Sequence, residues 1–194
     1  MKFFVSLVCM LALVSANAQK SSDPPKPTVV DHSVMDMSYW PIKYPYLKLN
    51  GQAKTMPVAR VIYSRPLKEG RTIFGKGSKQ PYGALWRLGA NEATEIDFFR
   101  SVKVGGKLIP KGRYTMYCIP EQDNWTLIIS SDNYIWGHFK YTPSKDVVRK
   151  TVPLEQTDEA IEAFTMYFEE TRTGANLIML WDDIKAALPI TLVK

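Results

Sequence analysis

Short apolar segments that recur roughly every 8–12 residues, punctuated by glycine and proline, are the feature that most constrains this fold. In residues 94–98, the side chains at 94, 96 and 98 alternate with the acidic Glu95 and Asp97, the two-residue period of a half-buried strand. Gly105-Gly106, with an apolar segment on either side, predicts a tight hairpin. No segment shows a long 3.6-residue period. The pattern predicts an all-β fold: an antiparallel β-sandwich or jelly-roll-like single domain, with a partly open β-barrel as the alternative.

Three segments fit this pattern less regularly. Residues 29–50 are aromatic and are interrupted by Pro41 and Pro45, so we expect extended edge segments there. Residues 71–74 are predicted to be a short strand between glycines. Residues 158–162 are predicted to form one helical turn.

The N-terminus has the pattern of an export signal. A positive residue precedes the apolar segment 3–14, and residues 15–18 provide an A-x-A cleavage site. The apolar segment is shorter than the roughly 20 residues that span a bilayer. We therefore expect residues 1–18 to be a cleaved signal peptide, residues 19–28 a Pro-rich flexible leader and residues 29–194 a single all-β domain.

Export and charge restrict the partners that we expect. A chain with this signal is expected in the periplasm or outside the cell, with no transmembrane segment in its mature part. The formal net charge is +6, but the basic residues do not cluster, which argues against a nucleic-acid partner. The partner is expected to be a small molecule or another protein, and the sequence leaves the oligomeric state open.

Motifs for metals, cofactors or catalysis do not stand out. His32 and His138 are far apart, and neither has a second ligand at metal-binding spacing, so no metal and no cofactor are predicted. No phosphate-binding loop or nucleophile motif appears, which leaves open whether the protein is an enzyme. Because Cys9 lies in the predicted signal, Cys118 is expected to be a buried thiol without a disulfide partner.

The densest polar cluster lies in residues 82–94, which contain Trp86, Arg87, Asn91 and Glu92. Arginine offers a planar donor fork to a carboxylate or phosphate, asparagine donates and accepts, and glutamate accepts or acts as a base. A neighbouring tryptophan can provide a stacking wall. We interpret these four residues as candidate ligand-binding residues. The structural alternative is that Arg87 pairs with an acidic residue and that Asn91 closes a turn.

Arg65 and Arg71 form a second candidate group. They lie on either side of a predicted turn, and together they form a candidate anion-binding group. The alternative is that both are solvated surface residues.

Several motifs also occur in a specific order. They are Ser64-Arg65-Pro66, Gly70-Arg71-Thr72-Ile73-Phe74-Gly75, Pro81-Tyr82-Gly83, Trp86-Arg87-Leu88-Gly89-Ala90-Asn91-Glu92-Ala93-Thr94, Gly112-Arg113-Tyr114 and Trp136-Gly137. This series resembles domain-of-unknown-function family 2911 and covers about residues 50–193. The family pattern often has Thr where this chain has Leu88. The resemblance implies an exported bacterial protein with no established activity. It implies no catalytic residues. Because residues 86–94 match the family's pattern, we place the candidate site on Trp86, Arg87, Asn91 and Glu92.

Our leading functional hypothesis is a ligand-binding module of the periplasm or cell surface. Arg87 would hold an anionic or hydroxylated group, Asn91 would orient it, and Trp86 would stack against it. An envelope assembly or interaction protein is a further alternative, which an exposed apolar patch or a free edge strand would favour.

A hydrolase-like enzyme is the second hypothesis. Glu92 would act as general acid or base, with Asp97 or Glu95 as a second carboxylate. Glu95 and Asp97 point to the same face of a regular strand, so the alternative is that they simply form its solvent face.

Overall fold

The computed structural model describes residues 31–193, which contain strands and two short helices. The predicted signal peptide (1–18) and leader (19–28) lie outside the described residues. In chain order the elements are β1 (Met35–Trp40), α1 (Tyr44–Leu49), β2 (Ala59–Ser64), β3 (Glu95–Phe98), β4 (Val102–Val104), β5 (Lys107–Ile109), β6 (Gly112–Pro120), β7 (Asn124–Ser130), the 3-10 helix η1 (Pro143–Lys145), β8 (Asp146–Thr171) and β9 (Gly174–Leu192).

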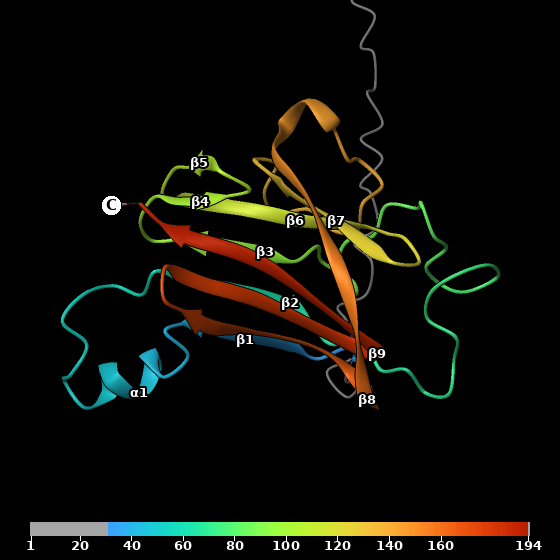
Figure 1. Ribbon diagram of the computed structural model, residues 1–194, viewed down its shortest axis with the longest axis horizontal. Coiled ribbons are helices and arrows are strands. Elements are labelled where there is room, and N and C mark those ends of the chain that lie inside the picture. The colour runs from blue at the N-terminus through green and yellow to red at the C-terminus, as the bar shows by residue number, and fades with distance from the viewer. Residues whose placement is uncertain (1–30, 194) are drawn as a thin grey trace, which may run out of the picture. The chain divides into compact units, whose positions relative to one another are not determined.

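The strands form one nine-stranded sheet in the order β1-β2-β3-β6-β7-β8-β9-β4-β5, and every neighbouring pair is antiparallel. β7 pairs with residues 146–153 of β8, and β9 pairs with residues 154–171. β8 therefore continues from one layer into the other (Figure 1). The end strands β1 and β5 are not paired with each other, so the sheet folds over without closing. The predicted all-β sandwich class is confirmed.

An aromatic cluster fills the space between the layers. The rings of Phe74, Trp86, Trp125 and Trp181 have neighbouring centroids 5.4–5.9 Å apart, and Phe164 lies 5.1 Å from Trp86. All five side chains are buried. Because each large aromatic ring removes about 150–250 Å² from water, this cluster is a major part of the hydrophobic core.

The β4–β5 hairpin confirms its prediction. Gly105 and Gly106 have φ angles of 57° and 83°, so both central residues of the turn are left-handed. This is the backbone of a type I′ turn, whose twist matches that of the paired strands.

Three local expectations are wrong, one of them only in part. The extended edge expected in residues 29–50 is present as β1, an end strand of the sheet, but residues 44–49 form a helix, which accommodates Pro45 in its first turn, where no N–H is needed. Residues 71–73 form no strand, and only Phe74 makes an isolated bridge, to Gln80. Residues 158–162 continue β8 instead of forming a helical turn, and two register shifts take up their extra length.

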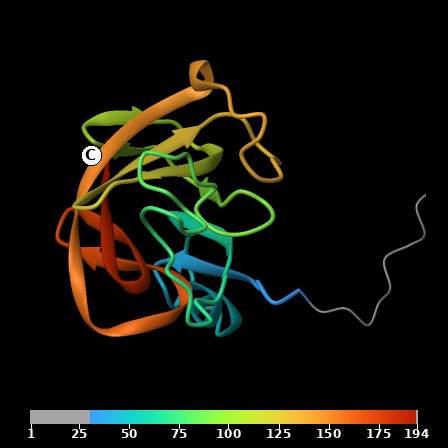
Figure 2. The same cartoon turned by 90° about the vertical axis from the view of Figure 1, so that its right-hand side faces the viewer.

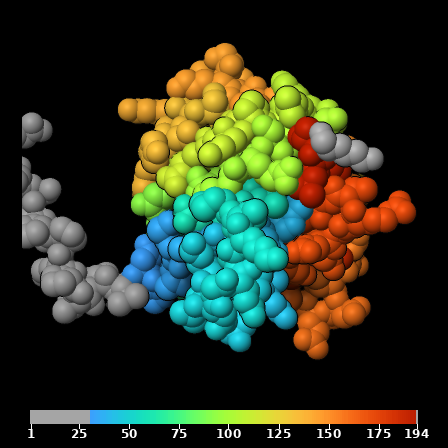
Figure 3. Space-filling view, turned by 90° about the vertical axis from the view of Figure 1, so that its left-hand side faces the viewer, coloured from blue at the N-terminus to red at the C-terminus, as the bar shows by residue number. Residues whose placement is uncertain are grey.

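The two ends of the sandwich carry different loops. Residues 41–58, including α1, cover one end (cyan in Figure 3). The long connection between β2 and β3 covers the opposite end (green in Figure 2). Among residues 31–193, no helix has the length and hydrophobicity needed to cross a membrane.

Candidate functional site

All the candidate residues lie in the connection between β2 and β3, residues 65–94. Trp86 fixes this connection to the sheet: its N–H donates to the Cys118 carbonyl (2.7 Å), and the Cys118 N–H donates back (2.8 Å). Cys118 itself is fully buried and free of disulfides, and burial raises the pKa of its thiol. The connection is therefore held against the second half of β6.

The indole ring of Trp86 is packed in the hydrophobic core and is not exposed for stacking on a ligand. Its side chain is only 4% exposed, and one ring face stacks on Trp181 at 5.7 Å. Its indole N–H donates to the Gly89 carbonyl at 3.0 Å. Because one ring face is packed and the side chain is almost fully buried, we correct the expected role of Trp86 from stacking on a ligand to supporting the residues that follow it.

The backbone after Trp86 folds into a tight loop. Leu88 is buried with a left-handed φ of 56°, which few non-glycine residues adopt. A Cβ on Gly89 would lie 3.1 Å from the Ser64 carbonyl oxygen, so the loop needs a glycine there. The Thr94 N–H donates to the Arg87 carbonyl (3.1 Å), and its hydroxyl donates to the Leu88 carbonyl. This loop places the Arg87 side chain at the rim of the core.

Arg87 lines a cleft of about 280 Å³ that we call the cationic cleft. Its basic residues are Arg71, Lys79, Arg87 and His138. Its other lining residues are Ser33, Pro66, Ile73, Gln80, Trp86, Gly89, Ala90 and Trp181. Within the described part of the chain, no acidic residue lines this cleft.

Arg87 has no counter-charge in residues 31–193. Its Nε is buried without a hydrogen-bond partner, and none of the ion pairs among these residues includes it. Burial lowers the pKa of its guanidinium, which shows that the charged form is poorly solvated. The predicted alternative, in which Arg87 pairs with an acidic residue, is not what this part of the structure shows.

His138 is the second unpaired group of the cationic cleft. Its Nδ1 is buried and makes no hydrogen bond within the described residues. Burial and the neighbouring charge of Arg87 lower the pKa of its imidazole. The ring is therefore neutral at neutral pH and adds a polar edge without a second fixed charge.

Arg71 and Lys79 complete the cleft from more exposed positions. Arg71 is held by its own turn: its Nε donates to the Lys68 carbonyl at 2.9 Å, and its Nη2 donates to the Leu67 carbonyl. Glu69 lies 3.6 Å from the same guanidinium. Lys79 is exposed. These two exposed side chains lie at the entrance of the cationic cleft, whereas the half-buried Arg87 lies deeper in it.

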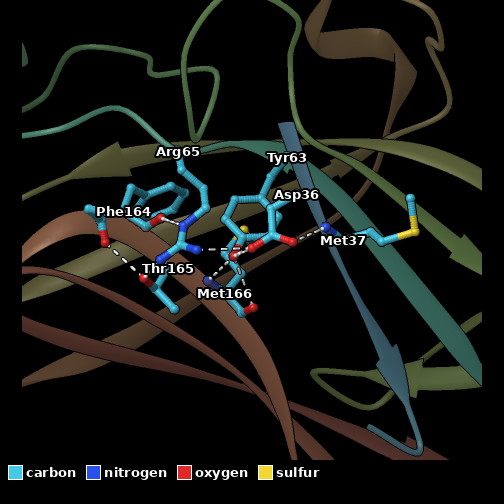
Figure 4. A network of polar contacts seen from close by, with 8 residues as sticks. Asp36, Met37, Tyr63, Arg65, Phe164, Thr165 and Met166 are labelled. Carbon is cyan, nitrogen blue, oxygen red and sulfur yellow. Dashed lines mark hydrogen bonds and ion pairs between the residues drawn. The ribbon is translucent and has the colours of Figure 1, made fainter. Parts of the chain in front are cut away.

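Arg65 lies outside the cationic cleft and acts as a clamp between layers (Figure 4). Its guanidinium donates to the Phe164 carbonyl (3.1 Å), to Asp36 Oδ2 (3.2 Å) and to Thr165 Oγ1 (2.8 Å). These three partners come from β1 and β8. With its donors used in this way, Arg65 has a structural role in joining the two strands.

Asn91 and Glu92 also point away from the cationic cleft. The Asn91 side-chain amide donates to Asp31 Oδ2 at 2.6 Å, and the Asn91 backbone carbonyl accepts from the Gly137 backbone N–H at 2.8 Å. Asn91 has a left-handed φ of 56°, but its side chain bonds Asp31 and not its own backbone, the partner that the structural alternative expected. Glu92 lines a separate cleft of about 250 Å³ together with Glu95.

Of the carboxylates proposed for hydrolysis, Glu92 and Glu95 line one cleft, whereas Asp97 is held by two arginines. Asp97 binds Arg60 at 2.6 Å and Arg113 at 2.7 Å, and Glu95 lies 3.3 Å from Arg113. Arg60, Asp97 and Arg113 are in register across β2, β3 and β6, so they form a cross-strand charge ladder. Glu92 is outside this ladder. Residues 31–193 contain no cluster of three or more His, Cys, Asp or Glu side chains suited to a metal ion.

Sequence reasoning identified Arg87 and Arg71 but missed His138 and Lys79. Nothing near Lys79 marks it, and His138 is far from the candidate string in sequence. The one local signal was the Trp136-Gly137-His138 stretch, in which aromatic residues surround a glycine.

Comparison with known families decides the relationship. The family described as "Protein of unknown function (DUF2911)" matches residues 48–190. This chain belongs to the DUF2911 family. The resemblance predicted from the ordered motifs is therefore confirmed, and the DUF2911 match contains every lining residue of the cationic cleft except Ser33. No curated protein and no solved structure matches the chain.

Proposed function

We propose that this protein is an exported binding module for small anions, with Arg87 as the principal ligand contact. The observation that carries the proposal is the state of Arg87: its buried Nε has no partner, in a cleft whose described lining holds no acid. A poorly solvated charge is unfavourable until an opposite charge pairs with it. An anion in the cationic cleft would supply that pair.

The chemistry of the cleft favours carboxylate, phosphate or sulfate groups. A guanidinium donates two parallel hydrogen bonds to such groups, and these charge-assisted bonds are among the stronger ones in proteins. Arg71 and Lys79 at the entrance would add attraction at longer range. An anion paired with Arg87 would raise the pKa of His138, because the charge of Arg87 contributes, after burial, to lowering it.

A thermal-shift comparison tests the proposal. Sulfate, phosphate and acetate are each added to the wild-type protein, to Arg87→Gln and to Arg100→Gln, which changes the same charge at an exposed arginine outside the cleft. A ligand at a hundredfold excess over Kd stabilises the native state by about 2.7 kcal/mol. We expect at least one anion to stabilise the wild type and Arg100→Gln, and to leave Arg87→Gln unchanged.

A further variant separates charge from geometry. Arg87→Lys keeps the positive charge but loses the planar fork, so it should bind the anion more weakly than the wild type and more strongly than Arg87→Gln. Equal anion stabilisation in the wild type and in a folded Arg87→Gln would remove the basis of the proposal. Export is tested separately, by fractionating the native cells and locating the processed chain.

A role in interactions at the cell envelope is a second proposal, supported by β1. This strand is at one end of the sheet, and it exposes Met35 (58%) and Met37 (51%). Unpaired edge strands with apolar side chains are typical sites of association. If the wild type self-associates in sedimentation experiments and Met37→Lys does not, this role gains support. A monomeric wild type removes the argument for self-association.

A further inference from the structure

A stack of three aromatic rings extends from the cationic cleft to solvent. His138 lines the cleft, and its ring lies 5.3 Å from that of Phe139, with 25° between their planes. The Phe139 ring lies 5.8 Å from that of Trp136, at 23°. Only two ring-to-ring steps therefore separate the cleft from Trp136.

The outer rings of this stack are exposed to an unusual degree. Trp136 is 59% exposed and Phe139 is 72% exposed. Tryptophan has a large apolar area and is highly buried on average in soluble proteins. Two adjacent exposed aromatic rings beside a polar cleft are typical of a binding surface, because an apolar partner gains by covering them.

The position of the stack is fixed by the backbone. The Gly137 N–H donates to the Asn91 carbonyl at 2.8 Å, and the Ala93 N–H donates to the Ile135 carbonyl at 2.9 Å. Gly137 has a left-handed φ of 71°, and a Cβ there would lie 2.7 Å from the Phe139 ring. Glycine is thus needed for the ring to fold over the chain. Residues 86–94, which contain Arg87, therefore also hold Trp136 in place through these two backbone hydrogen bonds.

We propose that the anion bound by Arg87 carries a ring, and that the flat face of this ring packs against Trp136 and Phe139. This inference rests on the proposed anion site and adds the class of ligand: an acidic group joined to a ring with an apolar face. Acidic sugars and aromatic acids share this chemistry. The positive charges of the cleft select the acid, and the exposed rings select the body of the ligand.

Titration calorimetry with matched ligands tests the inference. Acetate provides the carboxylate without a ring, glucuronate provides it on a sugar ring, and benzoate provides it on an aromatic ring. We expect at least one ring-bearing acid to bind the wild type about tenfold more tightly than acetate, which corresponds to about 1.4 kcal/mol. Of glucuronate and benzoate, the acid that binds more tightly relative to acetate shows whether the ligand's ring is a sugar or an aromatic ring.

Two variants assign the preference to the stack. Trp136→Ala should remove the preference for the ring while keeping acetate binding, and its exposed position means that the fold should be retained. Tyr46→Ala removes a similarly exposed aromatic ring (64%) on α1, at the other end of the sandwich, and should change nothing. Arg87→Gln should lose binding of every acid.

Each contrary outcome has a distinct meaning. If acetate binds through Arg87 and the ring adds no affinity, the inference about the ring is wrong and the anion site stands. If no carboxylic acid binds but sulfate or phosphate stabilises the wild type through Arg87, the inference about the ring is wrong and the anion site stands. If none of these anions binds, both proposals fail. Binding of phosphatidylglycerol vesicles that Trp136→Ala abolishes, without any preference for ring-bearing acids, would assign the aromatic pair to a membrane surface and overturn the inference.

Discussion

The guanidinium of Arg87 and the imidazole of His138 line the same cleft, and each has a buried nitrogen without a hydrogen-bond partner in residues 31–193. The two groups interact, because the charge of Arg87 contributes to the lowered pKa of His138 after burial itself. The cleft therefore has an excess of positive charge and hydrogen-bond donors. An anion would compensate both groups together.

The first prediction concerns pH. A bound anion offsets the charge of Arg87 and so raises the pKa of His138, and by linkage the affinity for the anion rises as the pH falls through the titration of His138. Sulfate suits the measurement because its own charge does not change there. We expect sulfate affinity to increase toward acid pH in the wild type and to lose this dependence in His138→Gln. The same pH dependence in both proteins would contradict the coupling.

The same residue affects stability with a defined sign. The pKa of His138 is lower in the folded protein than in the unfolded chain, so the unfolded chain binds more protons between the two values. Its contribution to the free energy of unfolding is therefore full above the unfolded pKa of about 6.5 and decreases as the pH falls below it. Denaturant unfolding of wild type and His138→Gln over this range measures the difference.

The second prediction compares two glycines with similar backbones. Gly137 and Gly51 have φ angles of 71° and 66°, but only Gly137 has a neighbour in the place where a Cβ would be. Replacement of either by alanine should cost about 1–2 kcal/mol for the left-handed backbone. Gly137→Ala should be the more destabilising, because Phe139 has to move, and it alone should weaken the preference for ring-bearing acids. Equal effects of the two variants would show that the ring stack is not held by Gly137.

The third prediction concerns the charge ladder on β3. Burial acts to raise the pKa of Asp97, but the hydrogen bonds from Arg113 and Arg60 outweigh it and hold the pKa below its usual value. Asp97→Asn should reduce the free energy of unfolding by about 1–3 kcal/mol, because both arginines lose a charge-assisted partner. Glu155→Gln, which removes an exposed ion pair with Lys185, should destabilise the protein less than Asp97→Asn does, because solvent screens exposed charges.

The stability from Asp97 should also depend on pH. Because its folded pKa is lowered, the contribution is fully present above the unfolded pKa of about 3.9 and is lost as the pH falls through the folded value. Unfolding of wild type and Asp97→Asn should therefore converge in acid. A gap between them that stayed constant to the lowest measurable pH would contradict this assignment.

The fourth prediction tests the link between β2 and β8. The Tyr63 hydroxyl accepts from the Met166 N–H at 2.9 Å and donates to the Met166 carbonyl at 3.2 Å, and its side chain is buried. Burial raises the pKa of this phenol to about 12. Tyr63→Phe should destabilise the protein by about 1–3 kcal/mol, because two buried backbone groups lose their partner. Tyr46→Phe, on the exposed face of α1, should have no measurable effect in the same denaturant titration.

Local patterns in the sequence predicted much of the sheet. The alternation in residues 94–98 marked β3 correctly, because one face of this strand packs on the core and the other carries Asp97. Gly105-Gly106 correctly predicted the hairpin between β4 and β5, because the two-residue turn that joins paired strands needs left-handed backbone angles, which glycine adopts readily. The helix at residues 44–49 was missed, because Pro45 indicates a break unless it falls in the first turn.

The site was only partly predictable for a different reason. Arg87 stood out because it lies in a dense polar string, but whether it has a partner depends on the tertiary fold. His138 is brought to it by the backbone pairing of Gly137 with Asn91, a contact between segments distant in sequence. Trp86 was expected to face a ligand, yet tryptophan next to glycine and polar residues can equally be drawn into a core, as its packing on Trp181 shows.

The most direct test of the account observes Arg87 itself. The Nε–H of an arginine gives its own signal in nitrogen-edited NMR spectra, and Arg87→Gln identifies that signal by its disappearance. We predict that addition of sulfate shifts the Arg87 Nε–H signal in a saturable way, with the same Kd as calorimetry gives, while the Arg100 signal shows no saturable change. An Arg87 signal that stays in place while sulfate binds elsewhere, or while no binding is detected, would contradict the central claim.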